Sequence, residues 1–243
     1  MTDDSAIPTK LTASTLTSQV EEYITTLIKE QSLKPGDLVP SEMQLAQALG
    51  ISRGIVREAY RSLGTLGIIE IKSGRKPRVK AFDSSVLEML LNFASTTAQV
   101  KLSEIIELRE GLELSCVTLA AQRITDEEIV ELSHEMDNIR TCIEDARAFI
   151  EHDLRFHNLI AQASHNFLYT LLLQALHQQI VLSIKGGFEL QSTQEQRRRI
   201  IELHQSIYEA LSNHDVEAAA KSTHEHFSTV SAVVTTNKPN ENK

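Results

Sequence analysis

The chain has 243 residues, 41% of them hydrophobic and 23% charged, a composition typical of globular proteins rather than of disordered or fibrous ones. No run of about 18 apolar residues could cross a membrane, and residues 1–10 lack the apolar stretch of a secretory signal, so we expect a cytoplasmic protein with no membrane partner. Cys116 and Cys142 are too few for a disulfide framework, and we expect both thiols to be reduced.

The formal net charge of −9 is distributed unevenly along the chain. Residues 1–80 carry 11 Lys and Arg against 9 Asp and Glu, whereas residues 81–243 carry 13 against 24. Within residues 51–80 there are eight basic residues and only two acidic ones. This asymmetry indicates a module that faces nucleic acid, attached to an acidic body.

The N-terminal region has the pattern of three helices. Their predicted spans are 18–31, 41–49 and 53–66. Ser18 with Glu21 three residues later forms a capping-box pattern at the start of the first helix. Gly50 is placed to end the second helix, and Ser52 is placed to cap the third. Two short helices joined by a tight turn predict a helix-turn-helix.

A β-hairpin is predicted after the third helix. Ile68–Ile71 has the character of a strand, Ser73–Gly74 that of a tight turn, and Val79 lies in the returning strand. The cations of Arg75–Arg78 follow the turn directly, so the hairpin is expected to form a basic wing that approaches the DNA backbone or minor groove.

The third helix carries the recognition signal. Its N-terminal end enters the major groove in this motif, and Arg53 and Arg57, four residues apart, leave the same face of it. Arginine pairs bidentately with guanine. The alternative is that these are solvated surface charges, but the caps, the turn and the hairpin agree, so we expect binding to double-stranded operator DNA. The predicted contacts are Ser41, Ser52, Arg53, Arg57, Gly74 and Arg75.

Several short motifs in this region belong together. They are Pro40-Ser41-Glu42, Leu49-Gly50-Ile51-Ser52-Arg53 and Val56-Arg57-Glu58-Ala59. They closely resemble the DNA-binding domain of the GntR family of bacterial regulators, which implies that Ser52, Arg53 and Arg57 contact operator DNA. The same role is implied for Gly74 in the wing. One position departs from the family, because Met43 stands where an arginine is usual, and one contact common in relatives is therefore expected to be missing.

From residue 84 onward the chain has consecutive amphipathic helices with short breaks. The predicted spans are 84–98, 102–123, 126–142, 144–164, 166–188, 193–212 and 214–234. Gly186–Gly187 is a candidate break or kink near the end of the fifth of these. Residues 236–243, with Asn, Lys and Pro, are expected to be disordered.

All nine histidines fall in this region, and most need no special role. Asp153 and His157 are four residues apart on one helix face, while His204 and His226 each lie in the apolar stripe of a later helix. One carboxylate and three imidazoles that face one bundle interior could hold a divalent metal, with Zn²⁺ preferred and Ni²⁺ or Mn²⁺ as alternatives. The other interpretation is that they are hydrogen-bonded core residues.

A second resemblance concerns this helical region. It rests on Arg109-x3-Glu113, Asp153-x2-Phe156-His157, Ser164-x-Asn166, His204-x2-Ile207 and His226-Phe227. The pattern looks like the ligand-binding domain of the FadR branch of the same family, called the FCD domain. There the aspartate and three histidine positions bind a metal in many members, whereas members without the histidines bind acyl-CoA. Because all four positions are kept, the resemblance implies the metal-binding type.

Two further residues are candidates for effector binding. A guanidinium on an apolar face is costly to bury without a carboxylate partner. For Arg109 that partner could be Glu113, one turn further on, or the carboxylate of an effector gripped bidentately. Asn166 could contact the effector or simply cap its helix.

These observations predict a mainly α protein. We expect a winged helix-turn-helix domain over residues 11–80, an all-helical domain over 84–235 and a disordered tail over 236–243. The protein is expected to be a homodimer that reads a pseudo-palindromic operator and a repressor controlled by a metal and a small hydroxy- or sugar acid. One alternative is an enzyme that activates water on the metal, for which no spare general base has convincing spacing. The other is a purely structural metal.

Overall fold

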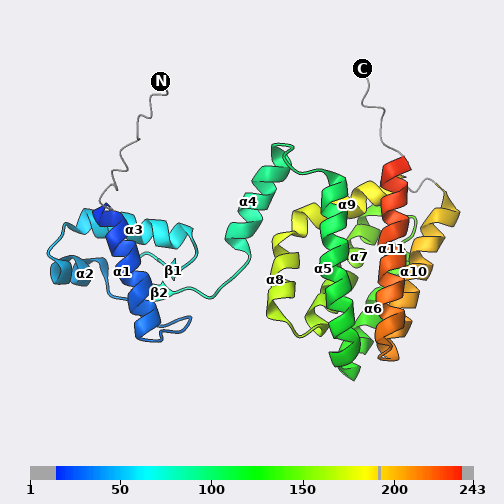
Figure 1. Ribbon diagram of the computed structural model, residues 1–243, viewed down its shortest axis with the longest axis horizontal. Helices are drawn as coiled ribbons and strands as arrows, with labels where there is room; N and C mark the ends of the chain where they lie inside the picture. Colours follow the sequence, from blue (N-terminus) through cyan, green and yellow to red (C-terminus); the bar gives the residue numbers. More distant parts are fainter. Residues whose placement is uncertain (1–14, 191–192, 237–243) are drawn as a thin grey trace, which may run out of the picture. The chain divides into compact units, whose positions relative to one another are not determined.

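The computed structural model describes residues 15–190 and 193–236, with the side chains of 233–236 excepted. The chain divides into two compact units, one that ends at Val86 and one that begins at Leu87 (Figure 1). The elements of the first unit are α1 (Leu16–Glu30), α2 (Glu42–Leu49), α3 (Arg53–Thr65), β1 (Ile69–Glu70) and β2 (Arg78–Val79). The predicted mainly α fold with an N-terminal winged helix-turn-helix is confirmed.

Local hydrogen bonds explain where α2 and α3 begin and end. The Ser41 hydroxyl accepts from the backbone N–H of Gln44, and the Gln44 side chain accepts from the backbone N–H of Ser41, which completes a capping box. Gly50 ends α2 in the left-handed conformation with φ of 66°, where a side chain would be strained. Ser52 caps α3 by accepting from the N–H of Ile55 at 3.3 Å. These caps fix the turn between the two helices.

The start of α1 differs from the prediction. The helix begins at Leu16 and its cap is Thr15, whose hydroxyl accepts from the N–H of Ser18 at 3.2 Å. Ser18 therefore lies within the first turn and is not the cap. Val20 and Ile24 still form the buried face of α1, because the period of the apolar positions does not depend on where the helix begins.

The wing is shorter than the strand signal suggested. Ile69 pairs with Val79 and Glu70 with Arg78 in an antiparallel register, so only two residues on each side form the ladder. Gly74 has φ of 72° in the intervening loop, a conformation that glycine adopts without strain. Ile69 is buried against the core of this unit, and that contact ties the hairpin to the helices.

The second unit is entirely helical in its described part. Its elements are α4 (Ser85–Thr96), whose first two residues precede the boundary, α5 (Leu102–Arg123), α6 (Asp126–Thr141), α7 (Ala146–Ala163), α8 (Phe167–Ala175), α9 (His177–Leu190), α10 (Gln194–Ser212) and α11 (Val216–Thr236). Figure 1 shows α5, α11 and α10 side by side, and α11 packs against both of the others. The expected tail begins one residue too early, because Thr236 belongs to α11; residues 237–243 lie outside the described part.

The predicted helix over 166–188 is two helices. The chain breaks at Leu176, where α8 and α9 meet with a bend of 66°, whereas Gly186–Gly187 lies inside α9. Leu176 is buried in the core, so tertiary packing, which a local breaker signal does not report, sets the break. No single described helix is long and apolar enough to span a membrane; the bent pair α8 and α9 meets the length and composition test only when taken together.

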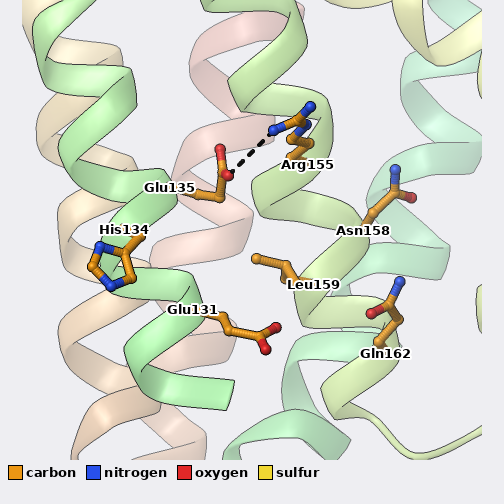
Figure 2. Close-up of a pocket in the computed structure, with 7 residues that line it drawn as sticks. All are labelled: Glu131, His134, Glu135, Arg155, Asn158, Leu159 and Gln162. Carbon is orange, nitrogen blue, oxygen red and sulfur yellow. Dashed lines mark ion pairs between the residues drawn. The ribbon is translucent and has the colours of Figure 1, made fainter. Parts of the chain in front are cut away.

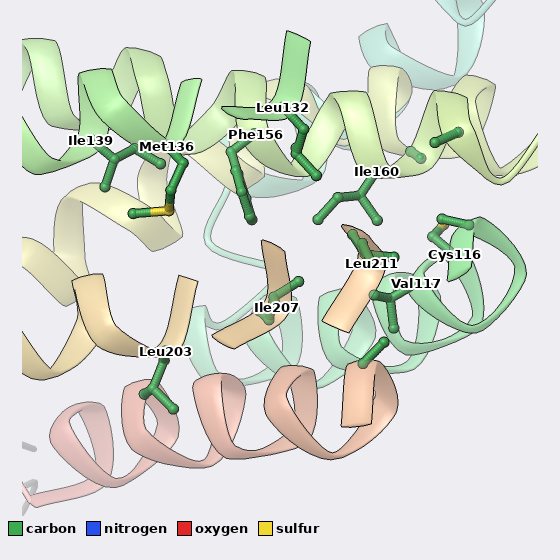
Figure 3. Packing of buried hydrophobic residues seen from close by; sticks show 14 of the residues in the cluster. Cys116, Val117, Leu132, Met136, Ile139, Phe156, Ile160, Leu203, Ile207 and Leu211 are labelled. Carbon is green, nitrogen blue, oxygen red and sulfur yellow. The ribbon is translucent and has the colours of Figure 1, made fainter. Parts of the chain in front are cut away.

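The core of the second unit is a continuous apolar cluster. Side chains from α6, α7 and α10, among them Leu132, Phe156 and Ile207, converge in one layer (Figure 3). Phe156 is fully buried, and burial of such a side chain contributes about 1.5–3 kcal/mol. This packing holds α7 and α10 in fixed positions, and each of them carries residues of the histidine cluster described below.

Candidate nucleic-acid interface and buried histidine cluster

The N-terminal end of α3 presents two arginines that share one carboxylate. Arg53 and Arg57 have 61% and 44% of their side chains exposed. Their Nε atoms lie 3.2 and 3.1 Å from the same atom, Oε2 of Glu42. Both guanidinium groups are therefore solvent-accessible and held at the same side of the helix-turn-helix.

The other residues predicted to contact DNA lie in the same unit. The hydroxyls of Ser41 and Ser52 cap α2 and α3, and capping leaves each oxygen at the N-terminal end of a helix, where N–H groups favour an anion. Gly74 and Arg75 are exposed in the loop of the wing. The exposed Met43, with 66% relative accessibility, follows Glu42 on α2. These positions form a candidate interface for nucleic acid.

The second unit brings together the four residues predicted to bind metal. Asp153 and His157 lie on α7, His204 on α10 and His226 on α11, and each is at most 6% exposed. The three imidazole rings have centroid separations of 4.6–5.3 Å. One nitrogen from each ring lies within 4.8 Å of the others. Asp153 Oδ1 lies 2.9 Å from His204 Nε2, and Asp153 Oδ2 lies 3.8 Å from His157 Nε2.

Contacts on the far side of two rings, one a hydrogen bond and one an ion pair, set which nitrogen faces the cluster. His204 Nδ1 lies 2.8 Å from the carbonyl oxygen of Ile200, so this nitrogen donates and Nε2 keeps its lone pair in the neutral ring. His157 Nδ1 lies 2.5 Å from Glu113 Oε2, which leaves its Nε2 on the cluster side. Histidines that bind metals are usually oriented by such a carbonyl or carboxylate.

Three ring nitrogens are buried without a well-directed hydrogen bond in the described part of the chain: Nε2 of His157, Nε2 of His204 and Nδ1 of His226. The contact of His204 with Asp153 is close but is not aligned as a hydrogen bond. Burial of an unpaired polar atom costs about 1–3 kcal/mol. Three such atoms close together therefore indicate a binding site for a ligand. A borderline divalent cation fits this donor set of imidazole nitrogens and a carboxylate.

Arg109 is held at two points and free at a third. Its Nε donates to Glu113 Oε1 at 2.8 Å, and its Nη1 donates to Ser183 Oγ at 2.6 Å. Its Nη2 is buried and has no hydrogen-bond partner among the described residues. The guanidinium also lies 5.2 Å from the ring centroid of Phe227. Glu113 is therefore the carboxylate partner, and one donor of Arg109 remains for another group.

The buried carboxylates remain ionised. Burial acts to raise the pKa of Glu113, but the charges of Arg109 and His157 outweigh it and lower the pKa to about 2. Burial acts on Asp153 in the same direction, and the charge of His204 is the largest of the effects that lower its pKa below the ordinary value. Ionised carboxylates are the form that binds a cation.

The imidazoles respond differently from one another. Burial lowers the pKa of His226 well below its ordinary value, and the neighbouring His204 adds to this effect. Burial acts to lower the pKa of His157 as well, but the charge of Glu113 outweighs it and the pKa is raised. His226 is therefore neutral at pH 7 and available as a ligand, while a metal at His157 would compete with a proton.

A small cavity adjoins the cluster. Its volume is about 20 Å³, enough for about one water molecule. It is lined by Arg109, Phe149, Asp153, Ser183, Ile184, Gly187, Phe188, Ile200, His226 and Val230. Asn166 is not among them; its Oδ1 accepts from the N–H of Leu168 at 3.1 Å and caps α8. Arg109 thus faces the same space as Asp153 and His226, and Asn166 does not.

A larger and more open cleft lies elsewhere, between α6 and α7 (Figure 2). Its volume is about 410 Å³, and its wall includes the ion pair of Arg155 with Glu135 at 3.8 Å. His152 also contacts Glu135, at 2.7 Å. None of the residues predicted to bind metal or effector lines this cleft.

The sequence did not single out two residues that the structure places at these sites. Ser183 follows Gln179 by one turn on the buried face of α9, and two polar residues at this spacing were the available signal. Glu42 was visible as part of the Pro40-Ser41-Glu42 motif, but it was given no role at the interface. Its contacts with Arg53 and Arg57 cross the turn between α2 and α3, and no local pattern reports such a contact.

Two protein-family models match the chain. The model described as "Bacterial regulatory proteins, gntR family" matches residues 16–79, and the model of the FCD domain matches residues 104–229. The first match covers α1 to β2, which hold the candidate nucleic-acid interface. The second runs from the first turn of α5 through most of α11, and the helices in this range hold the histidine cluster.

Individual proteins are similar over most of their length. The uncharacterized HTH-type transcriptional regulator YcbG of Bacillus subtilis (strain 168) is 33% identical over 214 residues, 88% of this chain and 87% of the relative. The HTH-type transcriptional repressor NanR of Escherichia coli (strain K12) is 28% identical over 222 residues, 89% of this chain and 83% of the relative. Among solved structures, Streptococcus agalactiae GntR matches with a TM-score of 0.65 and 25% identity, over 89% of this chain and 99% of that one.

Proposed function

The chain belongs to the GntR family of bacterial regulatory proteins and is a DNA-binding transcription regulator with an FCD domain; from that premise we propose that it is a repressor whose FCD domain controls operator binding through a divalent metal and a small organic acid. Repression is supported by the similarity to NanR, which is named a repressor. The relatives are transcription regulators, so catalysis is not the function of the histidine cluster.

The observation that carries the proposal is the set of unpaired ring nitrogens beside Asp153. They belong to His157, His204 and His226, on three helices, and two of the rings are oriented from behind by Glu113 and by a backbone carbonyl. We expect Asp153 and the three histidines to hold Zn²⁺, with Ni²⁺ or Mn²⁺ as alternatives. A bound metal would supply a Lewis-acidic position for an oxygen atom of the effector.

Arg109 supports a carboxylate as the effector's recognised group. Its free Nη2 and the metal candidates Asp153 and His226 line the same cavity. A hydroxy- or sugar acid offers both a carboxylate for the guanidinium and a hydroxyl for the metal. The cavity holds about one water molecule, so side chains must move to admit such an acid. The acid would then bind the rearranged domain more tightly than the closed one, and this difference in affinity is what allows it to shift the equilibrium between the two states. Asn166 has no contact with this cavity, and its role in effector binding stays a prediction.

Operator binding is expected to require two copies of the chain. A helix-turn-helix dimer reads two half-sites about one helical turn apart, and the two-fold axis of the protein matches that of the DNA. We therefore propose a homodimer that acts on double-stranded operator DNA in the cytoplasm. Release from the operator on binding of the acid would be derepression.

The test combines thermal shift with a gel-shift assay. A panel of hydroxy- and sugar acids is titrated into Zn²⁺-loaded protein and into chelator-treated protein. An effector raises the midpoint of unfolding only in the loaded protein, and it releases the DNA. His226→Ala abolishes both responses, whereas His134→Ala, an exposed histidine on α6, leaves them intact. Equal shifts with and without chelator, or stabilisation without release of DNA, would contradict the proposal.

A further inference from the structure

The ion-pair cluster at the start of α2 bears on how the protein reads DNA. Glu42 is the first residue of α2, and one of its oxygens, Oε2, accepts from Nε of Arg53 and from Nε of Arg57. The two arginines follow Glu42 by 11 and 15 residues, so the contacts bridge the two helices of the helix-turn-helix. The Glu42 side chain is only 22% exposed, while both arginines remain largely accessible.

The contacts of the two Nε atoms with Glu42 determine which edge of each guanidinium remains free to contact DNA. The guanidinium has five N–H donors in a fixed planar fork, one on Nε and two on each terminal nitrogen. With both Nε donors directed at Glu42, the outward edge of Arg53 and of Arg57 is the pair of terminal nitrogens. That edge makes the bidentate contact with O6 and N7 of guanine. The carboxylate also restricts two long side chains whose ordering would otherwise oppose binding.

The same contact reduces the charge of the interface. Two guanidinium groups four residues apart on one helix face repel each other, and like charges at this spacing are destabilising. The shared carboxylate brings the net charge of the three side chains to +1. Because attraction to phosphate is independent of sequence, this reduction weakens non-specific binding, while the outward edges stay available for bases.

We propose that Glu42 is a positioning residue that sets the sequence specificity of DNA binding by holding Arg53 and Arg57 with their terminal nitrogens outward. The proposal rests on DNA binding alone and not on the metal or the acid. A purely structural role is the competing interpretation, since a carboxylate in the first turn also favours the helix dipole of α2.

The experiment uses the full-length protein and two DNA probes. The first is the duplex enriched by the unmodified protein from a library with a random 20-base-pair centre, and the second is a scrambled duplex of the same composition. For Glu42→Gln we expect tighter binding to the scrambled duplex, a salt dependence steeper by about 0.9 in log K against log salt, and a ratio of specific to non-specific affinity lower by about tenfold. Glu58→Gln makes the same charge change on α3, at an exposed carboxylate that accepts from Thr17, and should leave the ratio unchanged.

A second variant separates position from charge. Glu42→Asp keeps the carboxylate and its interaction with the helix dipole but is one methylene too short to span both arginines. We expect it to lower the affinity ratio while binding to the scrambled duplex stays unchanged. If Glu42→Gln weakens binding to both duplexes equally, or if the ratio is the same in all four proteins, Glu42 has only a structural role. Midpoints of thermal unfolding, measured for each variant, identify any loss of folded protein.

Discussion

Arg109 and Glu113 lie one turn apart on α5 and form an ion pair of 2.8 Å in which both side chains are about 96% buried, since each is 4% exposed. The same glutamate contacts His157 Nδ1 at 2.5 Å. Glu113 therefore joins the effector candidate Arg109 to the metal candidate His157. A change at either end alters the position or the charge of the other through this single carboxylate.

Removal of Arg109 tests this relationship. Arg109→Met removes the guanidinium that pairs with the buried Glu113 and leaves it with His157 as its remaining charged neighbour. We therefore expect the free energy of unfolding in urea to fall by about 3–5 kcal/mol. Arg109→Met combined with Glu113→Gln should recover a large part of that loss, because glutamine carries no charge that needs a partner. A double variant as unstable as the single one would mean that the loss comes from packing and not from the unpaired charge.

Whether replacement of His226 raises or lowers the free energy of unfolding should depend on the presence of metal. His226 is buried and neutral, with an unpaired Nδ1 among the described residues. His226→Leu removes that atom, so we expect the metal-free protein to become more stable by about 1 kcal/mol. Added Zn²⁺ should stabilise the unmodified protein and not the variant, so that the unmodified protein becomes the more stable of the two. Urea unfolding with chelator and with Zn²⁺ measures both differences; His134→Gln is the control. If the same protein is the more stable one with chelator and with Zn²⁺, that result would argue against a metal at this histidine.

The sequence predicted most of the parts of the fold that local chemistry controls, although the cap of α1 is Thr15 and not Ser18. Gly50 ends α2 and Ser52 caps α3 as predicted, because a cap depends on residues three or four positions away. The break at Leu176 was missed in favour of Gly186–Gly187, because the buried contacts of Leu176 come from distant segments.

At the candidate sites, too, the sequence predicted what depends on nearby residues and missed what depends on contacts between distant segments. Helical period alone placed Asp153, His157, His204 and His226 on inward faces, and the structure brings their side chains together. It could not place Ser183 against Arg109, which is 74 residues away along the chain. Contacts between elements need the packing of whole helices, which periodicity does not specify.

Arg57 is the clearest single test of base reading. Arg57→Ala should weaken binding to the enriched duplex by about 1–3 kcal/mol and relax the preference at one base position. Arg61→Ala, an exposed arginine one turn further along α3, is the matched control and should have a smaller effect that does not depend on sequence. Gel-shift titrations against the duplex and its single-base variants give both quantities. Unchanged affinity for Arg57→Ala would remove this residue from the contacts.

Met43 allows a gain-of-contact test. It is 66% exposed beside Glu42, at the position where the resemblance to the GntR family leads us to expect an arginine. Met43→Arg should therefore add one phosphate or base contact. A new phosphate contact steepens the dependence of log K on log salt by about 0.9. Met43→Gln, polar but uncharged, should leave the slope as it is. An identical slope for both variants would place residue 43 away from the DNA backbone.

Tyr60 connects the recognition helix to the residue before Ser41. Its hydroxyl donates to the carbonyl oxygen of Pro40 at 2.6 Å, and the side chain has no exposed surface. Burial raises the pKa of this phenol well above its ordinary value, and the charge of Glu42 adds to the effect. In the folded protein Tyr60 therefore stays neutral at a pH where it ionises in the unfolded chain. Its contribution to stability is complete below the ordinary pKa of tyrosine, about 10, and is lost as the pH rises above that value.

Tyr60→Phe separates the hydrogen bond from this titration. At pH 8 the variant should be less stable by about 1 kcal/mol, because the Pro40 carbonyl loses its donor. Above pH 10 the stability of the unmodified protein should fall by about 1.4 kcal/mol per pH unit relative to the variant, so the two curves meet near pH 11. Urea unfolding of both full-length proteins between pH 8 and pH 11 measures this difference, in which the titration of every other group cancels. Parallel curves across that range would show that the Tyr60 phenol ionises equally in the folded and unfolded chains, and that its hydrogen bond to Pro40 does not hold the proton.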